Sequence, residues 1–360
     1  MALAGVRAHQ PGQALLSFYA SMEHLCSIAG PLLNYVNLSA IITATAQLWT
    51  SAQASISFKT SANKVGIEMT RFYCSTLLWL KPMLPDVEAQ AVSNILWSSA
   101  KLGLNPDAFV PGMTDALAAK LLQLTKGEAR RQPNAQECAN LVWALATLGH
   151  EPVDQSLADA LWDYFVSLIK HSDESKQPNA QGAANFMWAL ATLGHEPADQ
   201  SLTDAARDHF VSLIKQPDES KRPSAGGTAQ FMWAVATLGH EPVDQSLTDA
   251  VWDHFAKLIK HHDKSKQPNA KGAAQFLWAV AKLGHEPADQ SLTGAVCDHF
   301  VSLIKHSDES KRPSARGAAH FMWALATLGH EPADQSLTDA VCDHFVSLIK
   351  HSDESKRPRA

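Results

Sequence analysis

Apolar residues recur at helical spacing along this chain, and residues 179–194 show the pattern most clearly. The apolar positions there follow the i, i+3, i+4 spacing of a helix with one buried face, and they are Ala183, Phe186, Met187, Leu190 and Leu193. Asn179 follows a proline at the position of an N-cap, and Gly194 stands where a helix ends. The pattern predicts a first helix, helix A, from Asn179 to Leu193.

A second apolar pattern follows a short turn and predicts helix B, from about Ser201 to Lys215. Ser201 and Asp204 resemble a capping box with Asp in place of Glu. The apolar face of helix B consists of Leu202, Ala205, Phe210, Leu213 and Ile214. A polar linker then leads to the next proline and the next helix A. Because no strand pattern occurs, we expect an all-helical chain.

The pair of helices recurs every 45 residues, most plainly around a tryptophan. The segment 186–197 reappears with small changes at 141–152, 231–242, 276–287 and 321–332, which places tryptophans at Trp143, Trp188, Trp233, Trp278 and Trp323. A fixed period of this length is typical of stacked repeats, in which each unit packs on its neighbours. The expected fold class is therefore all-α, an α-solenoid of tandem 45-residue two-helix repeats.

The regular repeats occupy only part of the chain. Residues 1–63 form an N-terminal segment, in which 40–49 has helical spacing and is interpreted as a decayed repeat. Residues 64–132 are interpreted as irregular N-terminal repeats, with Trp97 in the tryptophan position. Near-identical tandem repeats fill 133–360, and the last five residues match the start of another unit. This ending suggests a truncated array.

Charge and composition narrow the possible functions. The chain has 360 residues and a formal net charge of −6, which is unfavourable for a nucleic-acid binder unless positive charge gathers along one edge. No apolar run reaches the ~18 residues of a membrane helix. The five cysteines include no C-x-x-C pair, which argues against a disulfide framework or zinc module and favours a reducing compartment. The first 22 residues contain Arg7 but no acidic residue, which fits either a weak organelle transit peptide or an ordinary N-terminus.

Because the repeats are nearly identical, the positions that vary between them are informative. Seven residues before the tryptophan stand Gln90, Gln136, Gln181, Gly226, Lys271 and Arg316. Three residues before it stand Asn94, Asn140, Asn185, Gln230, Gln275 and His320. Four residues after it stand Lys101, Thr147, Thr192, Thr237, Lys282 and Thr327. The first two positions are four residues apart and share one helix face.

Residues at the first two of these positions, Gly226 excepted, are candidate base-reading residues. Asn and Gln offer a paired donor and acceptor to base edges, and some helical repeats read one RNA base with two or three side chains. The alternative is a solvent face on which any polar residue is tolerated. Three units carry amides at both positions, although Glu or Lys would be better helix formers than Asn, and this favours base reading.

Basic residues in the linkers before helix A are candidate phosphate contacts, namely Lys176, Lys221, Arg222, Lys266, Lys311 and Arg312. Asp and Glu occur in the same linkers, so this edge is mixed. The opposite turns are acidic and carry Glu151 and Asp154, Glu196 and Asp199, Glu241 and Asp244, Glu286 and Asp289, and Glu331 and Asp334. Negative charge would thus be concentrated at one edge of the array.

Glycines in the first turn of helix A, Gly182, Gly227, Gly272 and Gly317, each cost about 1 kcal/mol relative to alanine. One of two interactions is expected to offset this cost. The first is close packing against the preceding helix B, and the second is the approach of a phosphate to the helix N-terminus. The repeated tryptophans are expected in the core, with base stacking as the alternative.

The repeated histidines are expected to be structural, because three or four ligands do not converge in any unit. They are His150, His195, His240, His285 and His330 in the turns, and His209, His254, His299 and His344 in helix B. No catalytic triad, phosphate loop or metalloprotease motif occurs, so we expect no enzymatic activity, no metal and no cofactor.

The segment AQ-x-x-AN-x-x-WALATLG, present at 135–149 and 180–194, resembles the octotricopeptide repeats of green algae. It also resembles the helical repeats that accompany RAP and FAST-kinase-like domains in organelle proteins. The resemblance covers about residues 86–360, although the unit here is longer than the usual octotricopeptide unit. It implies an α-solenoid of chloroplasts or mitochondria that binds specific RNAs and governs transcript stability, splicing or translation.

Two classes of function follow from these patterns. The first is a single-stranded RNA-binding repeat protein in organelle post-transcriptional gene expression, which the variable amides favour. The second is a protein-interaction scaffold of the HEAT or armadillo kind, which the negative net charge favours. If no organelle signal is present, we expect a soluble intracellular protein.

Overall fold

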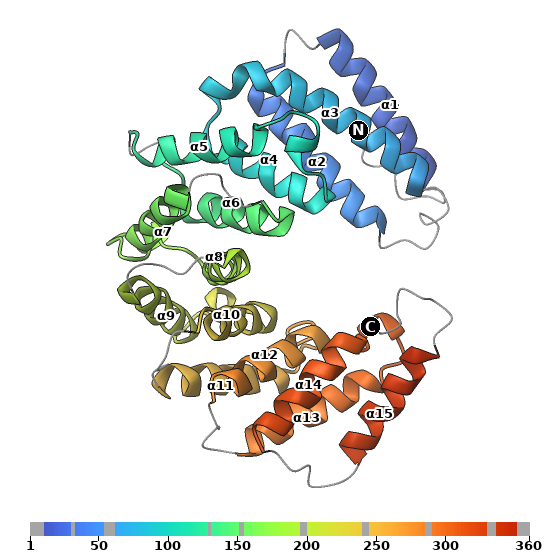
Figure 1. The fold of residues 1–360 in the computed structure, drawn as a ribbon, viewed down its shortest axis with the longest axis vertical. Coiled ribbons are helices and arrows are strands. Elements are labelled where there is room, and N and C mark those ends of the chain that lie inside the picture. Colours follow the sequence, from blue (N-terminus) through green and yellow to red (C-terminus); the bar gives the residue numbers. More distant parts are fainter. Residues whose placement is uncertain are drawn as a thin grey trace. The chain divides into compact units, whose positions relative to one another are not determined.

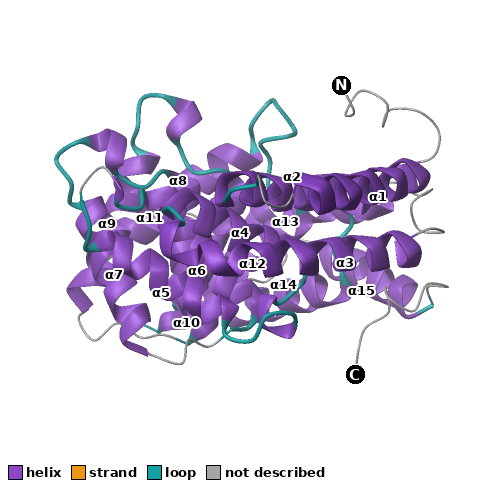
Figure 2. Cartoon of the chain, turned by 90° about the horizontal axis from the view of Figure 1, so that it is seen from above, coloured by secondary structure: helices purple, strands orange, loops and turns teal. Residues whose placement is uncertain are grey.

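The computed structural model describes residues 11–29, 33–53, 62–128, 131–150, 155–194, 200–239, 245–284, 290–329 and 336–350. Regular structure within these ranges is entirely helical, and successive helices pack as neighbours in an α-solenoid (Figures 1 and 2). The expected all-α class and solenoid packing are confirmed. The chain divides into two compact units, residues 1–168 and 169–360, which we describe separately.

The first unit contains three helices in a row, α2 (Tyr35–Gln53), α4 (Ala89–Leu102) and α6 (Ala135–Leu148). The helix α3 (Ala62–Leu80) packs on α1 (Pro11–Ala29) and α2, and α5 (Met113–Thr125) packs on α4. The 3-10 turns Lys81–Asp86 and Pro106–Ala108 join these elements, and α7 (Gln155–Ile169) ends at the boundary with the second unit. Residues 40–49, interpreted as a decayed repeat, lie in α2, which packs on α4 as α4 packs on α6.

The second unit consists of two layers. The helix A layer is the row α8 (Ala180–Leu193), α10 (Ala225–Leu238), α12 (Ala270–Lys282) and α14 (Ala315–Thr327). The helix B layer is the row α9 (Gln200–Ile214), α11 (Gln245–Ile259), α13 (Gln290–Ile304) and α15 (Ser336–Ile349). The predicted bounds of both helices are confirmed to within one residue. Helix α9 begins at Gln200, so Ser201 lies in its first turn instead of at its N-cap.

Each helix A of the second unit begins at a side-chain cap. The Asn179 Oδ1 accepts a hydrogen bond from the Gly182 backbone N–H at 2.8 Å, and Ser224 Oγ does the same for Gly227 at 3.2 Å. At the other end, Gly194 adopts a left-handed conformation with φ of 66°, which favours glycine. The predicted caps of helix A are therefore confirmed.

Gly227 and Gly272 lie against their caps and an alanine of the preceding helix A, which corrects, at these two positions, the expected packing against the preceding helix B. A Cβ built on Gly227 would lie 3.4 Å from Ser224 Oγ and 3.9 Å from the Ala184 Cβ on α8. Gly182, Gly227 and Gly272 are buried, so packing explains them without a phosphate. In α6 the same position is Glu137, which forms a capping box with Asn134.

Stacked phenylalanine rings join α9, α11 and α13 each to the helix A that follows it. Phe210 stacks on Phe231, Phe255 on Phe276 and Phe300 on Phe321, with ring centres 3.8 to 3.9 Å apart. All six rings are fully buried. These stacks therefore lie at the centre of the core and hold successive helices together.

The helix B histidines connect the two layers through a hydrogen bond to a proline carbonyl. The Nε2 atoms of His209 and His254 lie 2.8 Å from the Pro178 and Pro223 oxygens, and those of His299 and His344 contact Pro268 and Pro313 in the same way. Tyr164 replaces histidine in α7, and its hydroxyl donates to the Pro133 oxygen at 2.8 Å. The contacts support the structural role that the sequence predicts for these histidines.

We expect the fold to lose stability as the pH falls below about 6.5, the usual pKa of histidine. Burial lowers the pKa of both His209 and His254. The unfolded chain then binds more protons than the folded chain, so the free energy of unfolding decreases with falling pH. The double variant His209→Tyr/His254→Tyr should keep both hydrogen bonds, as Tyr164 does, and show a smaller decrease. Urea unfolding at pH 7.5 and 5.5 checks this, and equal decreases in both proteins would contradict it.

Candidate nucleic-acid interface

Four positions of each helix A form one exposed stripe, which we call the helix A ladder. They stand seven and three residues before the tryptophan, at the tryptophan, and four residues after it. In the second unit the ladder comprises Gln181, Asn185, Trp188 and Thr192 on α8, Gly226, Gln230, Trp233 and Thr237 on α10, Lys271, Gln275, Trp278 and Lys282 on α12, and Arg316, His320, Trp323 and Thr327 on α14. In the first unit it comprises Gln90, Asn94, Trp97 and Lys101 on α4, and Gln136, Asn140, Trp143 and Thr147 on α6.

The candidate base-reading residues are accessible in both units. All six residues at the first ladder position are exposed, and all six at the second are partly exposed. Because α8, α10, α12 and α14 lie side by side, the ladder residues of the second unit form adjacent columns. The structure therefore brings the predicted polar residues together within each unit.

The tryptophans lie on the ladder at the edge of the core, not buried within it as expected; Trp278, for example, is partly exposed and packs against the buried cluster. Trp143, Trp188, Trp233 and Trp278 are partly exposed, and Trp323 is 47% exposed. The buried aromatic residue of helix A is instead the phenylalanine two residues earlier, such as Phe231. The tryptophan falls three residues after one ladder amide and seven after the other, so helical geometry places it on their face.

Hydrogen bonds tie the ladder amides to one another. The Gln136 Nε2 donates to Asn140 Oδ1 at 2.7 Å, one turn apart on the same helix. Asn185 Oδ1 accepts from Gln181 Nε2 at 2.8 Å and from Gln230 Nε2 of the next helix at 3.2 Å. Each amide carries more donors and acceptors than these bonds use, so this network orients the groups and leaves hydrogen-bonding capacity for a ligand.

The tryptophan faces differ from helix to helix. The Lys101 Nζ lies 5.5 Å from the ring centre of Trp97 and 4.8 Å from that of Trp143, within the range of a cation–π contact. Trp278 contacts three ladder neighbours, namely Lys282 at 5.2 Å, His320 at 6.1 Å and Trp323 at 6.2 Å. Among the described residues, Trp188 and Trp233 have no such ring or cation partner, so a planar ligand could stack there.

Positive charge within the second unit's ladder is confined to α12 and α14. Lys271, Lys282 and Arg316 supply it, whereas the ladder positions of α8 and α10 are uncharged. Burial and the nearby Arg316 lower the pKa of His320. At neutral pH His320 therefore acts as a hydrogen-bonding and stacking group and adds no charge.

The candidate phosphate contacts divide into engaged arginines and exposed lysines. Arg222 Nε donates to the Gln216 oxygen at 2.6 Å, and Arg312 Nε donates to the His306 oxygen at 2.8 Å. Gln177 and Gln267 form the same kind of hydrogen bond across the other linkers.

The side-chain bonds of the two arginines thus stabilise the linker conformation. The four lysines, Lys176, Lys221, Lys266 and Lys311, are exposed.

The described part of the chain contains no group of three or more potential metal ligands. His150 lies between two carboxylates, with Asp115 Oδ1 at 2.9 Å from Nε2 and Asp107 Oδ2 at 3.4 Å from Nδ1. Cys74, Cys138, Cys297 and Cys342 are free thiols, and burial raises the pKa of Cys297 to about 12. No helix in the described ranges combines the length and apolar character needed to span a membrane.

Several sequence-based expectations lie outside the described residues. They concern the N-terminal residues up to Gln10, the acidic turns at 151–154, 195–199, 240–244, 285–289 and 330–335 with their histidines other than His150, and the C-terminal residues 351–360. The predicted acidic edge and transit peptide therefore stay predictions.

A scan against protein-family models finds no match, and a search of curated proteins finds no significant relative. The fold defines the class, an all-helical repeat protein of the α-solenoid kind. The resemblance to octotricopeptide repeats stays a prediction.

Proposed function

We propose that this protein binds single-stranded RNA along the helix A ladder. The observation that carries this proposal is the composition of one exposed stripe, in which partly exposed tryptophans stand beside amide and basic side chains on adjacent helices. Aromatic rings stack on unpaired bases, and Asn, Gln, Lys and Arg bind base edges. Single-stranded RNA presents both features because its bases can be splayed out.

The local distribution of charge supports the proposal despite the net charge of −6. No ladder position carries an acidic residue, and the charged ladder residues are all basic. A strand on this surface would therefore meet neutral or positive groups. The proposed role is RNA stability, splicing or translation in a chloroplast or mitochondrion, and the octotricopeptide resemblance is its support. No enzymatic step is proposed.

The alternative is a protein-interaction scaffold. Its partner would contact the same ladder, because amides and tryptophans also occur in protein interfaces. The two functions differ in their response to nucleic acid. A scaffold would show no affinity for single-stranded RNA at low salt, where phosphate contacts are strongest.

We expect Asn185→Ala and Gln230→Ala to change base preference at single, adjacent positions of a bound RNA. Each substitution removes one amide that can pair with a base edge, and such a contact is worth ~1–3 kcal/mol of discrimination. Affinity selection from randomised RNA with each variant measures the preference. Ser212→Ala, an exposed substitution on α9 away from the ladder, is the control. An equal loss of affinity for all sequences would contradict base reading by these residues.

A further inference from the structure

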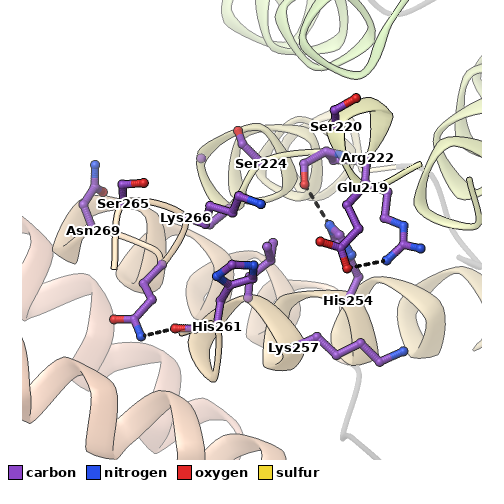
Figure 3. A pocket seen from close by; sticks show the side chains of 15 residues that line it. Glu219, Ser220, Arg222, Ser224, His254, Lys257, His261, Ser265, Lys266 and Asn269 are labelled. Carbon is purple, nitrogen blue, oxygen red and sulfur yellow. Dashed lines mark hydrogen bonds and ion pairs between the residues drawn. The ribbon is translucent and has the colours of Figure 1, made fainter. Parts of the chain in front are cut away.

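A basic pocket lies beside the ladder in the second unit, between the start of α10 and the end of α11 (Figure 3). Its volume is about 690 Å³, and the linkers before α10 and α12 form the remaining walls. Its cationic lining consists of Arg222, Lys257 and Lys266, and the imidazole of His261 also faces it. We call it the α11 pocket.

Part of the positive charge of this region, that of Lys257 and Lys264, is specific to one repeat. Lys257 stands where the other helix B segments have a serine, namely Ser167, Ser212, Ser302 and Ser347. Lys264, in the adjoining linker, stands where the other linkers have a glutamate, namely Glu174, Glu219, Glu309 and Glu354. Relative to the other repeats, lysine in place of serine changes the charge by +1, and lysine in place of glutamate changes it by +2. The other repeats form the same helices without these lysines, so the fold does not require them.

The cations of the pocket are not equally available. Arg222 donates to two linker carbonyls and pairs with Glu219 at 3.6 Å, so its charge is largely satisfied. Among the described residues, neither the Lys257 side chain nor the Lys266 side chain has a hydrogen-bond or ion-pair partner. These two ammonium groups are therefore the main unpaired cations of the pocket.

His261 supplies a directed hydrogen-bond donor. Its Nδ1 accepts a hydrogen bond from the Asp263 backbone N–H at 3.0 Å, so in the neutral ring the proton resides on Nε2. In Figure 3 the ring lies below the Lys266 side chain, and the Lys257 side chain extends from the preceding turn of α11 with its ammonium pointing away from the ring; all three residues line the pocket. Two ammonium groups and an N–H donor in one cavity are suited to the oxygens of a phosphate.

The pocket meets the ladder at Gly226. This residue lines the pocket and also holds the first ladder position of α10, where the other helices carry a glutamine, lysine or arginine. A Cβ at Gly226 would have no atom within 4 Å, so the space in front of it is open. A ligand can thus extend from the ladder into the pocket without meeting a side chain at this position.

We propose that the α11 pocket binds a phosphate group through Lys257, Lys266 and His261. The expected source is the backbone of a single-stranded RNA on the ladder, and that assignment rests on the proposed function. The other source is a free phosphate compound, for which the pocket alone suffices. Lys266 recurs in the other linkers and His261 in most of them, so what sets this site apart from its counterparts is Lys257, which only this repeat carries.

The first experiment tests phosphate binding without RNA. The full chain is titrated with inorganic phosphate and then pyrophosphate, and the imidazole signal of His261 is followed by nuclear magnetic resonance. The signal is assigned by its loss in His261→Gln, since Gln216 occupies this position in the preceding repeat. We expect a saturable shift that is absent in the double variant Lys257→Ser/Lys264→Glu, which restores the residues of the sibling repeats.

The second experiment measures RNA affinity of the same double variant as a function of salt. We expect affinity to fall about five- to tenfold for all sequences alike. The slope of log affinity against log salt should decrease in magnitude by about 0.7 for each phosphate that the variant no longer neutralises. Lys305→Glu/Lys350→Ser is the control, because it removes the same charge from exposed positions outside the pocket.

The outcomes separate the two sources and the two proposals. Weaker RNA binding with a smaller salt slope assigns the pocket to the strand backbone. A phosphate-induced shift with unchanged RNA affinity assigns it to a free phosphate compound. Absence of both effects overturns the pocket proposal. If no variant or parent binds RNA, the proposed function fails, and the phosphate titration still decides the pocket.

Discussion

Replacing Phe276 by alanine is expected to lower the free energy of unfolding by about 3–5 kcal/mol. The ring is fully buried on α12 and stacks on Phe255 of α11 at 3.9 Å. Its removal leaves a cavity where two successive helix pairs meet, and it also ends a ring contact worth ~0.5–1.5 kcal/mol beyond the area it buries. Urea unfolding of the full chain, followed by circular dichroism, measures the decrease.

Trp278→Ala is the matched control for this prediction. The tryptophan lies two residues further along the same helix and is larger, but its ring is partly exposed on the ladder. We therefore expect a distinctly smaller loss of stability than for Phe276→Ala. A larger loss for Trp278→Ala would place the tryptophan in the core and contradict the assignment of the ladder face.

Trp233→Ala is expected to weaken single-stranded RNA binding by ~1–3 kcal/mol, or about five- to 150-fold. Trp233 lies on α10 and is partly exposed. Because α10 packs between α8 and α12, Trp233 lies between Trp188 and Trp278. It lacks the lysine and histidine contacts that cover Trp278, so a base can stack on its face. Filter binding with a selected RNA measures the effect.

Two controls accompany this measurement. Trp233→Phe keeps an aromatic surface at the same position and should retain most of the affinity. Circular dichroism establishes that the alanine variant keeps its helices. Unchanged affinity in a folded Trp233→Ala protein would show that this tryptophan does not stack on RNA.

Helix positions were predictable because the signals for them are local. Asn179 and Gly194 mark the ends of α8 through capping and a left-handed φ, which depend on a few neighbouring residues. The apolar spacing of Ala183, Phe186 and Met187 likewise identified residues that are buried. Repetition of this segment then predicted the solenoid, because each unit must bury its apolar face on the next.

The position of the tryptophans follows from helical geometry and not from residue type, which favours the core for a large apolar side chain. Trp188 follows Asn185 by three residues and Gln181 by seven, so the sequence already placed the three on one face. The neighbour of Gly227 is not predictable from the sequence for a different reason. Which helix lies within 4 Å of Gly227 depends on the packing of two repeats, and no local pattern encodes it.

The α11 pocket was only partly predictable. Lys266 and Arg222 were candidate phosphate contacts from their linkers, but their linkers are separated by a whole helix pair. Only the folded chain shows that Arg222 is engaged with carbonyls, whereas Lys257 and His261 share a cavity with Lys266. A comparison of the repeats would have identified Lys257, because serine occupies that position in the four sibling helices.

The most direct test of RNA binding is selection from a random single-stranded RNA pool at two salt concentrations. If the ladder binds RNA, we expect enriched sequences with defined bases at regular intervals, and an affinity that falls as salt rises because salt weakens the binding of phosphates. Absence of RNA binding at low salt would show that the ladder does not bind RNA and would favour a protein partner.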